Sequence, residues 1–261
     1  HHLLSMTSGI YEDFSRSKTY DIEKVVFPES HPISTNALVH YFGELTSDSK
    51  PGKKFDYSNI NYILLAAIIE KTTGLEYGEY LKQTFWQPLG MVSTEFGSLN
   101  TNQELLSKPY LGLPTQHENP EFWHDSWVLG AGGIFSSASD LHRWMLGINK
   151  HAILDSLYSK KLFTKHTSLY GYGWQIGKRQ GNTYFSHEGG TLGYVCEAGF
   201  FPELDLYIVV LTNHTHGITE IGKTVNLNKE INREIQNIVF GKPYKKLPVP
   251  SDNVKISING N

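Results

Sequence analysis

The chain has 261 residues, 39% of them hydrophobic and 19% charged, a balance typical of a soluble globular protein with a full core. Lys and Arg number 23 against 26 Asp and Glu, a net charge of -3 without a long block of either sign, so the composition gives no reason to expect nucleic-acid binding. No apolar stretch approaches the roughly 20 residues of a membrane-spanning helix, and the single cysteine, Cys196, excludes an internal disulfide bond.

The first half of the chain has the patterns of short helices. Leu3 to Gly9 is typical of the last turns of a helix that a glycine closes, and Ser34 to Leu45 predicts a second short helix. The strongest pattern runs from Asn59 to Thr73, which is apolar on nearly every face and therefore predicts a helix in the middle of a domain. Ser58 or Asn59 can cap this helix, and Gly74 can close it.

A long irregular segment follows. Helical spacing continues from Tyr77 to Trp86, and Gly97 to Trp127 is then polar and without a sustained period. A loop of that length in a compact domain is more often a substrate-side wall or lid than filler. The glycine-rich stretch Gly130 to Gly133 leads to Ser137 to Asp140, a capping-box pattern that predicts the start of another helix. The apolar positions of that helix are Leu141, Trp144, Met145 and Ile148.

The pattern changes from helical to strand-like after Tyr170. Four short runs rich in Tyr, Phe, Val and Ile predict strands at Gly173 to Gly177, Tyr184 to His187, Tyr194 to Phe201 and Leu206 to Thr212. The connections are too short for crossovers, so the strands are expected to pair as antiparallel hairpins. Gly217 to Phe240 then predicts a closing helix. The residues expected to lie on the sheet are Ile221, Val225, Ile231, Ile235 and Ile238.

Four segments, in order, carry a resemblance to a known family. They are His2-Leu3-Leu4 with Thr7-Ser8-Gly9, Tyr57-Ser58-Asn59 before the apolar helix, Gly130 to Leu141, and His187-Glu188-Gly189-Gly190. The chain resembles serine β-lactamases of class C and their relatives, which include penicillin-binding proteins, D-Ala-D-Ala carboxypeptidases, D-aminopeptidases and family VIII esterases. A tyrosine before a helix, a glycine pair or a strand histidine is usually structural when it stands alone, so the order of all four segments carries the assignment.

The resemblance implies an α+β fold of the β-lactamase/transpeptidase type, in which helices flank an antiparallel sheet beside a mostly helical lobe. Residues 1–240 would form the C-terminal portion of one such domain, with the helical lobe at about 1–168, the sheet lobe at about 169–240, and a linker or tail at 241–261. The family relationship also implies export, although the chain shows no signal peptide.

The same resemblance implies roles for individual residues. A serine hydroxyl group needs a neighbouring base to become a nucleophile, and Tyr57 could act as that base only as a phenolate stabilised by nearby cations. His187 would donate to Tyr57 or to substrate, Asn59 would contact a substrate amide, and the N–H group of Gly190 would form half of the oxyanion hole. The residues expected beside the small-molecule or peptide substrate are Ser58, Glu188, Gly189 and Thr191, of which Ser58 is better suited to capping the helix.

The family's first motif, Ser-x-x-Lys, supplies the nucleophile and lies upstream of the segment at which this chain begins. Two such strings occur here, Ser15 to Lys18 and Ser47 to Lys50, but both follow the first segment and neither opens an apolar helix. We therefore read them as chance matches. The chain beginning at His1 is expected to be a C-terminal portion that cannot form an acyl-enzyme by itself.

Glu188 departs from the family pattern, which often has a small or hydroxyl residue there. A carboxylate pointing into the cleft would disfavour the carboxylate of a β-lactam, which favours an esterase or peptidase. Two other functions stay open. A binding or scaffold protein could keep the fold without the chemistry, and His214-x-His216 could indicate a metal-dependent hydrolase, although no carboxylate or cysteine stands at ligand spacing. No cofactor is implied.

Overall fold

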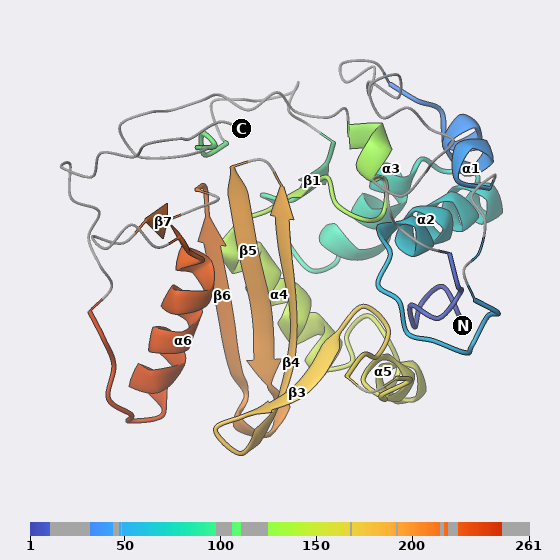
Figure 1. The fold of residues 1–261 in the computed structure, drawn as a ribbon. Coiled ribbons are helices and arrows are strands. Elements are labelled where there is room, and N and C mark those ends of the chain that lie inside the picture. Colours follow the sequence, from blue (N-terminus) through green and yellow to red (C-terminus); the bar gives the residue numbers. More distant parts are fainter. Residues whose placement is uncertain are drawn as a thin grey trace, which may run out of the picture.

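The fold consists of a helical lobe beside an antiparallel sheet that carries one helix on each face (Figure 1). A computed structural model describes residues 1–10, 32–43, 47, 49–97, 106–110, 125–167, 169–191, 193–214, 217–218 and 224–246. Within these ranges no helix is both long and apolar enough to cross a bilayer. The predicted α+β class is confirmed.

The sheet contains four strands in the order β3-β4-β5-β6, every neighbouring pair antiparallel. The strands are β3 (Gln175–Arg179), β4 (Asn182–Thr191), β5 (Tyr194–Phe201) and β6 (Leu206–Thr212). The predicted hairpins are confirmed, although β3 begins two residues later than expected because Gly173 adopts a left-handed turn conformation with φ +75°. The last β3–β4 pair joins Gln175 to Ser186, so the end of β4 continues beyond β3.

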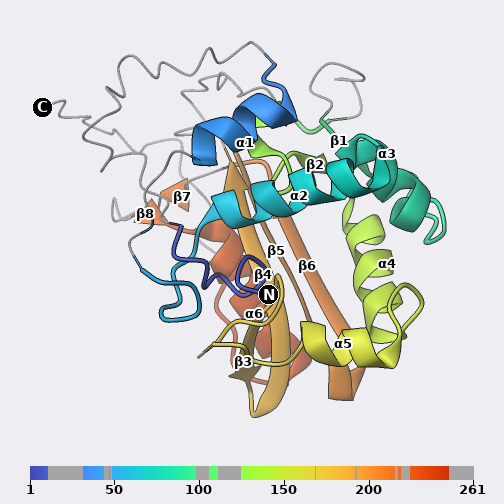
Figure 2. The ribbon, with the colours of Figure 1, turned by 90° about the vertical axis from the view of Figure 1, so that its right-hand side faces the viewer.

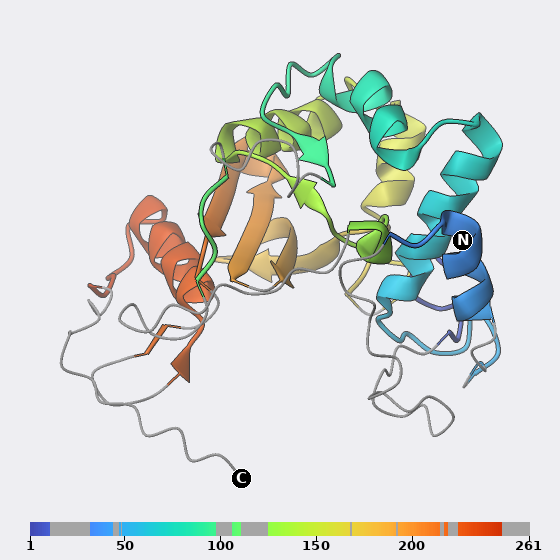
Figure 3. The same ribbon diagram turned by 90° about the horizontal axis from the view of Figure 1, so that it is seen from above.

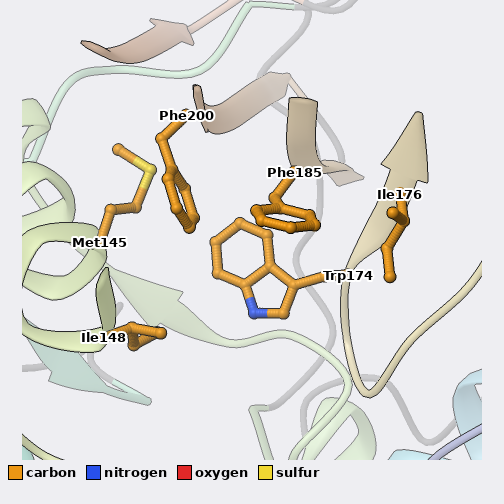
Figure 4. Packing of buried hydrophobic residues seen from close by; sticks show 6 residues of the cluster. All are labelled: Met145, Ile148, Trp174, Ile176, Phe185 and Phe200. Atoms are coloured by element: carbon orange, nitrogen blue, oxygen red, sulfur yellow. The ribbon is translucent and has the colours of Figure 1, made fainter. Parts of the chain in front are cut away.

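One face of the sheet packs against α4 (Ala138–Asn149), which begins where the capping box predicted. Ser137 caps the helix by accepting a hydrogen bond from the backbone N–H group of Asp140 at 3.2 Å. The buried cluster between α4 and the sheet contains Met145, Ile148, Trp174, Ile176, Phe185 and Phe200 (Figure 4). The rings of Phe185 and Phe200 lie with centroids 5.4 Å apart, and this cluster fixes the strand from which His187 projects.

The opposite face packs against α6 (Leu227–Val239), as Figure 3 shows. Tyr184, Phe201, Ile208 and Val210 form a buried cluster there, and Ile231 and Ile235 lie on it as predicted. Ile238 is 56% exposed, so its predicted position on the sheet is wrong. The helix instead buries Asn228, whose side-chain amide donates to the carbonyl groups of Val195 and Val210 at 3.1 and 3.0 Å.

The predicted closing helix begins later than its pattern suggested. Two short paired strands, β7 (Gly217–Ile218) and β8 (Thr224–Val225), precede it. The side chain of Asn226 accepts a hydrogen bond from the N–H group of Lys229 at 3.1 Å, and this cap starts α6 at Leu227. Val225 therefore belongs to a strand, and Ile221 lies outside the described residues.

The helical lobe is centred on α2 (Asn59–Thr73), whose bounds agree with the prediction (Figure 2). Gly74 ends it in the left-handed conformation and donates to the carbonyl group of Glu70 at 2.8 Å. Helix α2 packs against α1 (Thr35–Gly43) and α3 (Tyr77–Leu81), and the π-helix Lys82–Trp86 continues α3. The buried core of the lobe contains Leu38, Ile60, Ile63, Ala66 and Leu129.

Several smaller elements complete the two lobes. Strands β1 (Glu95–Phe96) and β2 (Ile134–Phe135) pair with each other, and a short 3-10 helix covers Asp125–Val128. Another 3-10 helix, Pro202–Leu204, connects β5 to β6. Helix α5 (Ser156–Leu162), which the sequence pattern did not predict, is capped by the side chain of Asp155.

The start of the chain forms hydrogen-bonded turns and no regular helix. The N–H groups of Ser5 and Thr7 donate to the carbonyl groups of His1 and His2, but Met6 has a φ of +55°, which interrupts a helix. The prediction that Leu3 to Gly9 completes a helix is therefore wrong. Most of Gly97 to Trp127 lies outside the described residues.

Candidate active site

The mouth of α2 presents the first group of candidate residues. Tyr57 is 45% exposed, Ser58 is fully buried, and Asn59 is the first residue of the helix. Ser58 has an extended backbone but makes no capping hydrogen bond, and its buried Oγ has no partner among the described residues. The prediction that its side chain caps α2 is therefore wrong. Burial also keeps Ser58 from contacting a substrate.

The first turn of α2 is bonded to the start of the chain. Asn61 is fully buried; its Nδ2 donates to the carbonyl group of Ser58 at 3.1 Å, and its Oδ1 accepts from the hydroxyl group of Ser8 at 2.5 Å. The hydroxyl group of Tyr62 donates to the carbonyl group of Leu4 at 3.0 Å. These bonds hold the first and the second of the four segments together and set the position of Tyr57.

The glycine-rich segment packs against the same helix. A Cβ atom at Gly130 would lie 2.5 Å from the carbonyl oxygen of Tyr62 and 2.6 Å from the Cβ atom of Ala66, so only glycine fits this contact. Asp140, at the end of the segment, is 1% exposed. Its carboxylate accepts from the N–H group of Ser93, the hydroxyl group of Thr94 and the guanidinium group of Arg143, at 2.7 to 2.8 Å.

His187 on β4 meets Tyr57 across the two lobes. Their ring centroids lie 6.2 Å apart, and Tyr170 contacts both rings, at 6.3 Å from Tyr57 and 6.0 Å from His187. The Nε2 atom of His187 lies 3.1 Å from the Tyr170 hydroxyl group, and its Nδ1 lies 2.7 Å from the carbonyl oxygen of Glu188. The structure thus brings together side chains from the second and the fourth segments.

Burial dominates the electrostatics of this group. It lowers the pKa of His187 below the usual 6.5, because the charged imidazolium loses solvation, although the adjacent Glu188 partly opposes the shift. Burial likewise raises the pKa values of Tyr62 and Tyr170 well above 10. At neutral pH these groups are therefore an uncharged imidazole and two protonated phenols. His187 does not supply the cation that a Tyr57 phenolate would need.

Glu188 points away from Tyr57. Side chains alternate along a strand, and Tyr184 faces α6 whereas Phe185 faces α4, so Glu188 lies on the α6 side and His187 on the other. Its carboxylate pairs with the ammonium group of Lys229 at 2.8 Å. Glu188 would disfavour a β-lactam only if its carboxylate pointed into the cleft, and this condition is not met.

The end of β4 is open for a ligand to approach. Gly189, Gly190 and Thr191 are exposed, and a Cβ atom at Gly190 would lie 3.7 Å from its nearest neighbour, the carbonyl oxygen of Tyr194. Gly189 stands opposite Cys196, whose Sγ would lie 3.2 Å from an added Cβ atom. Within the described ranges β3 does not reach this stretch.

The other candidate nucleophiles and ligands do not join this group. The hydroxyl group of Ser47 donates to the carbonyl groups of Gly9 and Ser49, and Ser15 to Lys18 lies outside the described residues. No group of three potential metal ligands occurs in the part of the chain that the structure describes, where His214 is included and His216 is not. Sequence reasoning missed Tyr62 and Tyr170, because a single tyrosine gives no signal of its own.

The β-lactamase family matches residues 1–227. The chain belongs to this family. It is 26% identical over 212 residues to the unguisins hydrolase UngD' of Aspergillus campestris, covering 74% of this chain and 40% of that protein. It spans about half the length of the curated relatives it matches, between 40% and 59%.

Solved structures of the β-lactamase fold agree with this assignment. The octameric penicillin-binding protein homologue from Pyrococcus abyssi has a TM-score of 0.73 and 25% identity, over 93% of this chain and 55% of that chain. A D-amino acid amidase from Ochrobactrum anthropi, at 19% identity, shares the fold with a TM-score of 0.72, over 92% of this chain and 70% of that chain. The chain is therefore a β-lactamase-like member of a family of hydrolases.

Proposed function

We propose that the full-length protein is a serine hydrolase that cleaves an amide or ester bond of a small molecule or peptide through an acyl-enzyme. The observation that supports this proposal is the 6.2 Å distance between the ring centroids of Tyr57 and His187, which belong to the second and the fourth segment, together with the exposure of the Tyr57 side chain. The names of the relatives, which include a hydrolase and an amidase, support the same class of reaction.

Tyr57 would be the base that accepts the proton of the serine hydroxyl group. A phenol with an ordinary pKa near 10 does this only when a cation stabilises its anion. Because His187 is uncharged at neutral pH, that cation would come from elsewhere, in the family pattern from the lysine of Ser-x-x-Lys. Asn59, beside Tyr57 at the mouth of α2, would bind the substrate amide through its own amide group.

Gly190 would stabilise the oxyanion that forms when the serine attacks. Its exposed backbone lies beyond the end of β3, where a carbonyl oxygen can approach without meeting a side chain. Loss of one such N–H donor typically costs about 3 kcal/mol of transition-state stabilisation. Gly189 and Thr191 would line the same approach.

Among the described residues, Ser58 is buried and Ser47 is bonded to backbone carbonyl groups, so neither is placed to attack, and the nucleophile would be the serine of the family's Ser-x-x-Lys motif. The test is intact-mass measurement after incubation with a fluorophosphonate, on this chain and on the full-length protein. We expect one stoichiometric adduct on the full-length protein and none on residues 1–261 alone. An adduct on this chain would refute the assignment of the nucleophile. An unreactive full-length protein would favour a binding or scaffold function.

A further inference from the structure

The tip of the β4–β5 hairpin has little support from the sheet itself. Pairing between β3 and β4 ends at Ser186, so among the described strands residues 188–191 pair with β5 alone. This stretch includes Gly189 and Gly190, and glycines lose more backbone freedom on folding than other residues. A stretch with one paired edge and two glycines opens easily unless another element holds it.

A short segment of the long loop, residues 106–110, is bonded to the end of the sheet. Asn213, directly after β6, binds this segment through its side chain and its backbone. Its side-chain amide donates to the carbonyl group of Lys108 at 2.8 Å, and its carbonyl group accepts from the N–H group of Tyr110 at 2.9 Å. We call residues 106–110 the strap.

The strap also contacts the tip of the hairpin. Gly193, in the β4–β5 turn, has a φ of +79°, and an added Cβ atom would lie 2.5 Å from the Cβ atom of Pro109 and 2.9 Å from the backbone nitrogen of Tyr110. The hydroxyl group of Tyr194 donates to the carbonyl group of Ser107 at 2.6 Å. A carbonyl oxygen can only accept, so the hydrogen of this hydroxyl group belongs to the bond with the strap. The strap therefore contacts both the turn and the first residue of β5.

Tyr194 lies on the same face of the sheet as His187. Cross-strand partners project to the same face, and the register pairs Ala198 with His187 and Tyr194 with Thr191. Ala198 packs in the cluster under α4, and Tyr194 shares its face because the two stand an even number of residues apart on β5. The ring of Tyr194 also contacts that of Phe135 on β2, at a centroid distance of 6.4 Å. The bond to the strap therefore holds the tip from the side that His187 occupies.

We propose that Tyr194 is a positioning residue: its bond to the strap fixes the tip of the β4–β5 hairpin, and with it the N–H group of Gly190. Gly190 pairs with Val195, the neighbour of Tyr194, so a displacement of Tyr194 also displaces Gly190. A donor that is fixed before the reaction stabilises an oxyanion without having to reorganise. The contribution to catalysis rests on the proposed function, whereas the hold of the strap on the tip does not.

The first test measures hydrogen exchange of the full-length protein by peptide mass spectrometry and needs no substrate. In the wild type, the amides of residues 188–193 that pair with β5 should exchange slowly. Tyr194→Phe keeps the ring and loses the hydroxyl group. We expect exchange of residues 106–110 and 188–193 to become about fivefold faster in this variant, because one hydrogen bond between them is lost.

Tyr207→Phe is the matched control. Its hydroxyl group is also bonded, to Asp205 and Asn149, but at the opposite end of the sheet, so exchange at the tip should stay unchanged. A second pair of variants tests the contact of the strap with the turn. Gly193→Ala should push the strap away and speed exchange at the tip. Gly181→Ala, in the β3–β4 turn with a φ of +83° and nothing within 4 Å of an added Cβ atom, should not.

Exchange of residues 188–193 at the rate of an unstructured chain in the wild type would overturn the proposal, and this result does not depend on a variant that folds. Unchanged exchange of both segments in a folded Tyr194→Phe variant would overturn it as well. So would an equal rise at the tip in Tyr207→Phe.

The second test compares kcat and KM of the same proteins on an ester substrate. We expect Tyr194→Phe to lower kcat by about tenfold and to leave KM within about twofold, because the oxyanion forms only as the reaction proceeds. Tyr207→Phe should keep both values. A wild-type kcat in Tyr194→Phe would contradict the positioning role. A wild type that is inactive on esters and amides would refute the proposed function, while hydrogen exchange would still decide whether the strap holds the tip.

Discussion

Gly130→Ala should destabilise the protein because Gly130 packs directly against α2. The position has a φ of +70°, and the new Cβ atom would lie 2.5 Å from the Tyr62 carbonyl oxygen and 2.6 Å from the Cβ atom of Ala66. Both neighbours are residues of α2, whose backbone is held by its own helical hydrogen bonds, so neither can move away easily. The variant would therefore push the glycine-rich segment away from the helix that carries Tyr57.

The matched control is Gly74→Ala. Gly74 has nearly the same φ, +71°, but an added Cβ atom would meet nothing within 4 Å. Both variants bear the left-handed backbone penalty of roughly 1 to 2 kcal/mol, whereas only Gly130→Ala bears an overpacking cost of about 1 to 3 kcal/mol. The difference between the two variants thus isolates the packing contact.

Urea denaturation followed by circular dichroism measures both free energies of unfolding. We expect Gly130→Ala to lose about 1 to 3 kcal/mol more than Gly74→Ala. Equal losses would show that the glycine-rich segment does not press on α2, and would refute the packing on which the position of Tyr57 depends.

Three further predictions concern buried charge, and urea denaturation measures each. Asp140→Ala should cost about 3 kcal/mol, because it leaves three donors without their acceptor, whereas Asp155→Ala should cost only about 1 kcal/mol as a lost helix cap. Glu197→Gln should stabilise the protein at neutral pH, because burial raises the pKa of this carboxyl group and Glu188 stands directly opposite on β4. The control Glu203→Gln, at an exposed position, should leave the free energy of unfolding unchanged. Burial lowers the pKa of His187, so the unfolded chain binds this proton more readily; stability should fall as the pH drops below 6.5, and less steeply in His187→Gln. Equal effects of the two Asp variants, a destabilising Glu197→Gln, or identical pH profiles would contradict the respective prediction.

The parts of the fold that depend on local signals were predictable from the sequence. Helix α2 has a closing glycine and an unbroken apolar run, and the predicted bounds hold. The strands could be predicted because aromatic and β-branched residues alternate between two packed faces. The burial of polar Asn228 on α6 could not be predicted. It depends on two strand carbonyl groups that accept hydrogen bonds from its side-chain amide.

The candidate site was predictable only in part. The family resemblance placed Tyr57 and His187 in one site, and the structure brings their rings together. Glu188 points to the α6 side of the sheet because side chains alternate along a strand, and a sequence motif alone does not give this direction. Tyr170 lies close to His187 because a turn before β3 packs between the two lobes, and that contact arises from tertiary structure alone.

The acylation rate of the full-length protein decides whether Tyr57 is the base that we propose for the acyl-transfer site. Rapid-mixing measurements with an ester substrate would compare the wild type with Tyr57→Phe and with Tyr158→Phe, a control at an exposed position on α5. We predict a loss of about 100-fold to 10,000-fold for Tyr57→Phe and an unchanged rate for Tyr158→Phe. Acylation of Tyr57→Phe at the wild-type rate would contradict the claim.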